Sequence, residues 1–191
     1  MKKVISLVSI LVVAVFSTAC INNLAVQDLN NKAKAYADKR DYTQAIERLK
    51  SSIDLDPSVF ETHYNLAIVY TQAEDYINAV EEYKKVIEMK PNNADSYYSL
   101  ATAENNLAVD MEQGRVRMNE DDSLYSPKPE DINFDEKLKL SDKENHLIEE
   151  LYNSAIENYQ KYLELNPNAK DKADVEAQIE KISGRNDKIE E

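Results

Sequence analysis

Several residue types are scarce in this chain, and each scarcity excludes a class of structure or site. Only 2 of 191 residues are glycine, which argues against strands, hairpins and phosphate-binding loops and favours helices joined by short turns. With 2 histidines and 1 cysteine, zinc ligation by clustered His and Cys is excluded, as is an internal disulfide. The formal charge is −13, so a nucleic-acid partner, which needs clustered Lys and Arg, is not expected.

No set of residues predicts catalysis. His63 and His146 belong to different helices, and His63 falls on a large-residue position of a buried helix face. No nucleophile can be paired with a base from the sequence, and most carboxylates lie on solvated helix faces. We therefore expect no catalytic residues, no metal, no cofactor and no small-molecule substrate. A hydrolase site within the insertion described below is the remaining alternative.

The first twenty residues form a secretory signal. Lys2 and Lys3 precede an apolar run over residues 4–16, followed by three small residues and then Cys20. The segment is short for a membrane span. It resembles a bacterial lipoprotein signal, although Ser17 stands where leucine is usual. The resemblance implies cleavage before Cys20, which would carry the lipid, with fatty acyl chains such as palmitate. Ordinary cleavage after Ala19 and an uncleaved anchor remain alternatives.

A short sequence motif recurs along the chain. "DYTQAIERLKSSIDLDP" at residues 41–57 is followed 34 residues later by "DYINAVEEYKKVIEMKP", and "LYNSAIENYQKYLELNP" at 151–167 is a third copy. Small residues recur with the same period, and each copy ends in proline, which terminates a helix. The recurring small residues are Ala33, Ala67 and Ala101, then Ala45, Ala79 and Ala155. They allow two helices of a hairpin to approach closely.

A period of 34 residues with this pattern resembles the tetratricopeptide repeat. His63-x-x-Leu66-Ala67-x-x-Tyr70 matches the first helix of the family pattern, and Ala79-x-x-x-Tyr83 with a late proline matches the second. Glu104 stands where tyrosine is usual. The resemblance implies an all-α fold, an α-α superhelix of about three helix hairpins stacked so that each buries the apolar face of the next.

The repeats define the expected organisation. The expected segments are a signal peptide at 1–19, a tether at 20–25, repeat 1 at 26–59, repeat 2 at 60–93, repeat 3 split between 94–107 and 149–168, an insertion at 108–148, a capping helix at 169–183 and a tail at 184–191. The third copy is 42 residues late, so the insertion lies between Ala101 and Tyr152. We expect its ends to be helical, with Ser141 and Glu144 forming a capping box, and an acidic mobile loop between them. We expect Ala173, Ala177 and Ile179 to form the buried side of the capping helix.

The family resemblance also implies a binding surface. Such repeats bind a peptide or helix in a concave groove lined by their first helices. Mapped onto this chain, the groove residues are Asn30, Lys34, Glu61, Tyr64, Ile68, Gln72, Asp95, Tyr98, Thr102 and Asn105. One subtype of the family clamps a carboxylate with Lys, Arg and Asn. Since Lys34 is the only basic residue in this set, we expect a basic or mixed segment instead.

Together, these features predict a membrane-anchored protein-interaction scaffold of the bacterial cell envelope, with a protein or peptide partner. An alternative is a subunit of an envelope assembly machine, such as outer-membrane protein assembly or pilus biogenesis. Ile21 after the cysteine predicts the periplasmic side of the outer membrane in a two-membrane host. In a one-membrane host, we expect the outer face of the cell membrane.

Overall fold

The structure is a computed structural model that describes residues 23–128 and 139–186. The predicted signal peptide and Cys20 lie outside these residues. The chain forms two compact units, one ending at Ala73 and the other beginning at Glu74. The division falls within the expected second repeat, so the first helix of that repeat belongs to one unit and the second helix to the other.

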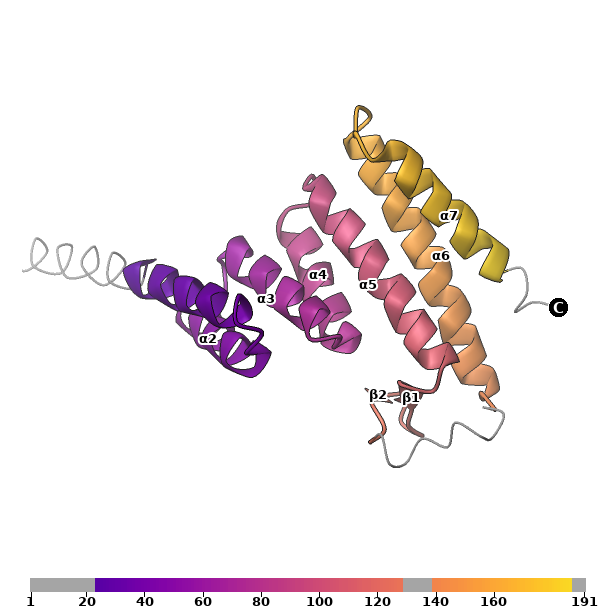
Figure 1. The fold of residues 1–191 in the computed structure, drawn as a ribbon, viewed down its shortest axis with the longest axis horizontal. Helices are drawn as coiled ribbons and strands as arrows, with labels where there is room; N and C mark the ends of the chain where they lie inside the picture. The colour runs from indigo at the N-terminus through magenta and orange to yellow at the C-terminus, as the bar shows by residue number, and fades with distance from the viewer. Residues whose placement is uncertain (1–22, 129–138, 187–191) are drawn as a thin grey trace, which may run out of the picture. The chain divides into compact units, whose positions relative to one another are not determined.

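The described part of the first unit, residues 23–73, forms a helix at 23–37, α2 (Tyr42–Leu55) and α3 (Phe60–Gln72) (Figure 1). Its core is formed by small and aliphatic side chains with at most 1% of their surface exposed. These are Ala33, Ala45, Leu49, Leu66 and Ala67. Because the alanines add almost no bulk at the crossings, larger side chains between them can interdigitate. The expected tether at 20–25 is helical from residue 23.

Within residues 74–128 and 139–186, the second unit forms four helices and a pair of two-residue strands. In chain order these are α4 (Tyr76–Met89), α5 (Ala94–Glu112), β1 (Arg117–Met118), β2 (Leu124–Tyr125), α6 (Asp142–Leu165) and α7 (Lys172–Asn186). In this unit α5 contacts both α4 and α6, and α7 packs on α6 (Figure 1). Ala79, Ala101 and Ala155 are fully buried. The predicted burial of small residues at the repeat positions is confirmed in both units, and so is the all-α class.

The recurring Asp-Tyr pair has a local structural cause. The carboxylate of Asp41 accepts a hydrogen bond from the backbone N–H of Gln44 at 3.2 Å, and Asp75 accepts one from Asn78 at 3.3 Å. Each aspartate thereby caps the N-terminus of a second helix. The preceding residues, Arg40 and Glu74, both have a left-handed backbone, with φ of 60° and 59°. The first two copies of the repeat therefore share the backbone conformation of this turn as well as its sequence.

The C-terminal helix differs from the expectation in its bounds and its buried side. Helix α7 begins at Lys172 and continues to Asn186, whereas residues 169–183 were expected. Its deeply buried residues are Val175 and Ile182, each 1% exposed, whereas Ala173 and Ala177 face solvent. A spacing of seven residues brings Val175 and Ile182 onto one face, so branched aliphatic side chains, not alanines, contact the preceding helix.

The insertion is more ordered than expected between residues 117 and 125. β1 and β2 pair antiparallel, with Arg117 opposite Tyr125. Helix α5 ends at Glu112, just before Gly114, whose φ of 72° is readily adopted only by glycine. At the other end, the predicted capping box of Ser141 and Glu144 is confirmed. The mobile loop was predicted at residues 120–135, and its residues 129–135 lie outside the described residues.

Candidate binding surfaces

In the first unit, two depressions lie along the predicted groove residues. One has a volume of about 660 Å³ and the other about 370 Å³. Asn30 and Glu61 line the larger depression, while Asn30, Lys34, Ile68 and Gln72 line the smaller one. The structure thus brings these five predicted residues to the surface between the helix at 23–37 and α3.

Asn30, on the helix at 23–37, contacts both α2 and α3. Its side-chain amide donates to Ser52 of α2 and Thr62 of α3, each at 3.0 Å, and to the carbonyl of Val26. Its side-chain oxygen accepts a hydrogen bond from Asn65 at 3.0 Å. Ser52 and Thr62 are fully buried. Asn30 therefore satisfies polar groups of the core, and it shapes the floor of both depressions instead of being free to bind a ligand.

Sequence reasoning missed several asparagines on this surface. Asn31 and Asn65 line both depressions, and Asn23 lines the larger one. The signal was present, because Asn31 and Asn65 are adjacent in sequence to two of the predicted residues. Side-chain amides both donate and accept hydrogen bonds, so this surface matches the backbone of an extended or helix-terminal peptide segment. Tyr64 is half buried and stacks on Phe60, with ring centroids 5.8 Å apart.

In the second unit, the four predicted residues form a stripe on α5. Asp95 and Tyr98 are exposed, while Thr102 and Asn105 are half buried. The hydroxyl of Thr102 lies 2.9 Å from that of Tyr159 on α6 and donates to the carbonyl of Tyr98. Thr102 therefore contributes to packing between α5 and α6. The exposed part of the stripe is its N-terminal half.

Glu104 joins the two halves of the split third repeat. Its side chain is fully buried, and its carboxylate oxygens accept hydrogen bonds from Ser154 and Asn158 of α6, each at 2.8 Å. Burial raises the pKa of Glu104, and the two hydrogen bonds offset only part of that shift. Glu104 stands where the repeat pattern usually has tyrosine. Its buried carboxylate is accommodated by hydrogen bonds from polar residues 50 and 54 positions later in the sequence.

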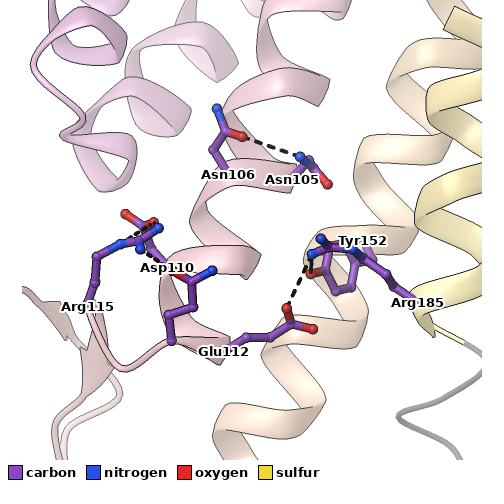
Figure 2. Close-up of polar contacts among 8 residues, drawn as sticks. Asn105, Asn106, Asp110, Glu112, Arg115, Tyr152 and Arg185 are labelled. Carbon is purple, nitrogen blue, oxygen red and sulfur yellow. Dashed lines mark hydrogen bonds and ion pairs between the residues drawn. The ribbon is translucent and has the colours of Figure 1, made fainter. Parts of the chain in front are cut away.

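A second polar contact joins α5, α6 and α7. Figure 2 shows Arg185 of α7 reaching Glu112 of α5 and the phenol of Tyr152 on α6, with donor–acceptor distances of 3.4 and 3.2 Å. Tyr152 is fully buried, and burial raises its pKa to about 12 despite the hydrogen bond from Arg185. This contact ties three helices together, so it has a structural role.

The same view shows Asp110 paired with Arg115 at the turn that follows α5 (Figure 2). These two residues, with Tyr76 and Asn106, line a depression of about 340 Å³ within the second unit. Asn105 donates to Asn106 at 3.4 Å. Because the charge of Arg115 is already compensated by Asp110, this depression offers no unpaired cation for an anionic ligand.

The described residues offer neither a clustered metal site nor a membrane-spanning helix. Residues 23–128 and 139–186 contain no group of three or more His, Cys, Asp or Glu side chains placed to hold a metal ion. Over the same ranges, every helix is too short or too polar to cross a membrane.

Comparison with known proteins identifies the repeats. The family model described as TPR repeat matches residues 33–73 and 68–103. Residues 33–103 of the chain thus match the tetratricopeptide-repeat family. Such repeats form protein-interaction modules and are a non-catalytic scaffold family. None of the curated proteins compared with the chain matches it.

Solved tetratricopeptide-repeat domains share the fold. The first such domain of Spaghetti (RPAP3), bound to an HSP90 peptide, is 17% identical; the match covers 85% of this chain and 93% of that one, with a TM-score of 0.56. The Arabidopsis OM64 domain is 15% identical, with coverages of 84% and 98% and a TM-score of 0.57. The TPR2B domain of yeast Sti1, in complex with an Hsp70 peptide, is 18% identical, with coverages of 85% and 98% and a TM-score of 0.52. At these identities, the likeness shows the fold alone.

Proposed function

We propose that this chain is a membrane-anchored, non-enzymatic scaffold of the bacterial cell envelope that binds a segment of a partner protein. The observation that carries the proposal is the pair of depressions along the first helices of the first unit, lined by amide side chains and by Lys34, Glu61, Ile68 and Gln72. Several solved relatives of the same fold hold peptides, such as the RPAP3 and Sti1 domains.

The chemistry of the surface favours a partner other than those peptides. The HSP90 and HSP70 peptides bound by the two RPAP3 domains end in Glu-Glu-Val-Asp and are acidic. Lys34 is the only basic residue among the predicted groove positions, and its ammonium group lies 3.3 Å from Asp38. An acidic segment would therefore meet little positive charge here. A basic or mixed segment with exposed backbone groups is the better match.

A pull-down from solubilised membranes tests this binding surface. Gln72→Arg places a bulky cation in the smaller depression, and Thr43→Arg places the same residue on the exposed side of α2. We expect Gln72→Arg to lower recovery of the partner roughly five- to thirtyfold, as truncation of an interface hot spot does. Thr43→Arg is expected to leave recovery unchanged. Equal recovery with both variants would remove the groove from the proposal.

The lipid anchor is the second part of the proposal. It rests on the sequence before Cys20, and the described residues begin at residue 23, three positions after that cysteine. Three residues span at most about 11 Å at ~3.6 Å each, so the first repeat would lie close to the bilayer surface. Two or more acyl chains are needed for stable anchoring, which a lipoprotein cysteine would carry.

Replacing the cysteine tests the anchor. Cys20→Ser is expected to move the protein from the membrane fraction to the soluble envelope fraction when cells are fractionated, because no acyl chain can then be attached. Ser17→Leu, which restores the usual lipoprotein residue, is the matched control and is expected to keep the protein in the membrane fraction. Membrane retention of a processed Cys20→Ser chain would contradict lipid anchoring.

A further inference from the structure

Three tyrosines form an aromatic cluster within the second unit. The ring of Tyr98 on α5 lies 5.5 Å from that of Tyr159 and 5.3 Å from that of Tyr162, both on α6. The interplanar angles are 70° and 62°, so both contacts are edge-to-face, a favourable geometry for aromatic pairs. Tyr159 and Tyr162 are buried, but 38% of Tyr98 is exposed. Tyr98 therefore presents a ring to solvent on a rigid aromatic base.

The hydroxyl groups of the two buried tyrosines already have partners. The hydroxyl of Tyr159 lies 2.9 Å from that of Thr102, and the hydroxyl of Tyr162 donates to the carboxylate of Asp171 at 2.7 Å. These bonds fix the orientation of both rings. The base of the cluster is thus held by hydrogen bonds as well as by packing, which leaves Tyr98 as its accessible member.

Two carboxylates flank the cluster. Asp95 is exposed and precedes Tyr98 by three residues on α5, so the two side chains share a helix face. Asp171 lies in the turn between α6 and α7 and contacts Tyr162 directly. The pKa of Tyr162 is raised, chiefly by the hydrogen bond to Asp171 and by burial, and the charge of Asp95 contributes in the same direction. Both carboxylates therefore act on the same aromatic group.

We propose that this surface, formed by Tyr98, Asp95 and Asp171 beside the buried Tyr159 and Tyr162, binds the cationic side chain of a lysine or arginine in the partner segment. The electron-rich face of an exposed tyrosine attracts a cation, and neighbouring carboxylates strengthen that attraction. The net charge of −13 favours approach of a basic segment. The inference rests on the proposed scaffold function and specifies the chemistry of its partner.

Binding of defined peptides tests the inference on the purified chain. The probe is a fluorescein-labelled decapeptide with four arginines separated by Gly and Ser, and its counterpart carries citrulline, a neutral residue of nearly the same shape, in place of each arginine. We expect Tyr98→Leu and Asp95→Asn each to weaken binding of the arginine peptide roughly three- to tenfold in fluorescence anisotropy titrations. The citrulline peptide is expected to bind at least tenfold more weakly than the arginine peptide.

Two control variants separate the site from general attraction to an acidic chain. Tyr125→Leu removes another exposed tyrosine, and Asp174→Asn removes one negative charge from α7. Both are expected to bind the arginine peptide within twofold of the unmodified chain. Loss of binding in Asp174→Asn equal to that in Asp95→Asn, equal binding of the citrulline peptide, or unchanged binding by Tyr98→Leu would each overturn the inference.

Failure of this site can be told apart from failure of the scaffold function. If Gln72→Arg abolishes partner recovery while Tyr98→Leu and Asp95→Asn retain it fully, the scaffold stands and the cation site is overturned. If the unmodified chain recovers no partner but the peptide results hold, the cation site stands and the scaffold function fails. Circular dichroism of Tyr98→Leu shows whether its helices remain folded, so a binding loss is not mistaken for unfolding.

Discussion

Glu144→Ala is expected to lower the free energy of unfolding of the second unit by about 3 kcal/mol. The carboxylate of Glu144 is 2% exposed and receives hydrogen bonds from the guanidinium of Arg117 at 2.7 and 3.2 Å. It also accepts from the backbone N–H groups of Met118 at 3.3 Å and Ser141 at 2.8 Å. Removing it breaks a largely buried ion pair, which commonly costs 3–5 kcal/mol, and removes half of a capping box.

The pH dependence of this contribution follows from the pKa of Glu144. Burial alone would raise that pKa, but hydrogen bonds from Arg117, Ser141 and Met118 outweigh burial and lower it from 4.5 to about 2. A carboxyl group whose folded pKa is depressed stabilises the fold fully above its unfolded pKa. The contribution of Glu144 is therefore constant at neutral pH and is lost as the pH falls from about 4.5 to about 2.

Urea unfolding followed by circular dichroism measures the effect. Glu150→Gln, an exposed carboxylate on the same helix, is the control and is expected to change stability by at most about 0.5 kcal/mol. Hydrogen exchange at the amide of Met118 reports the local consequence and is expected to accelerate in Glu144→Ala. Wild-type stability together with unchanged exchange at Met118 would show that Glu144 does not hold the β1–β2 hairpin.

Glu104 is expected to show the opposite pH dependence. Its pKa is raised by burial, so the ionised form is disfavoured in the folded state. The stabilisation from its protonated form is fully present below the unfolded pKa of 4.5 and is lost as the pH rises through the folded value. Glutamine has nearly the same shape as glutamate but does not ionise. We therefore expect the free energy of unfolding of Glu104→Gln, relative to that of the unmodified chain, to increase from pH 4.5 to pH 8.

Truncation of the same residue is expected to be costly at every pH. Glu104→Ala leaves a cavity and removes the acceptor of both Ser154 and Asn158, for an expected loss of about 2–4 kcal/mol. Glu81→Gln on the exposed side of α4 is the control for loss of one charge. Urea unfolding of the three variants at pH 4.5, 6 and 8 gives both results. A pH-independent difference between Glu104→Gln and the unmodified chain would contradict the raised pKa.

Features that repeat along the chain could be predicted from the sequence. The buried alanines follow from their 34-residue spacing, and the C-terminal ends of the second helices follow from the prolines that come shortly after them. Each of these features recurs with the period of the repeat, so the sequence shows it without knowledge of distant contacts. Ser141 and Glu144, three positions apart, likewise predicted the start of α6 correctly.

Features that depend on distant partners could not be predicted. Nothing near Glu104 in the sequence shows that Ser154 and Asn158 will receive its carboxylate after an insertion. The β1–β2 hairpin was missed because the acidic composition of residues 120–135 favours a loop, whereas its anchor is the contact of Arg117 with Glu144, 27 residues away. The predicted buried side of α7 was wrong, because the branched side chains of Val175 and Ile182, seven residues apart, are buried, whereas Ala173 and Ala177 are exposed.

Site-specific photo-crosslinking tests the central claim, that the first helices of the repeats contact a partner. The photoreactive residue p-benzoylphenylalanine is placed at Gln72 on α3 or Asp95 on α5, and at Thr43 on α2 or Glu81 on α4 as exposed positions of second helices. After irradiation of intact cells, we expect the same crosslinked partner from Gln72 and Asp95 and none from Thr43 and Glu81. Crosslinking from the two second-helix positions but not from the two first-helix positions would contradict the claim.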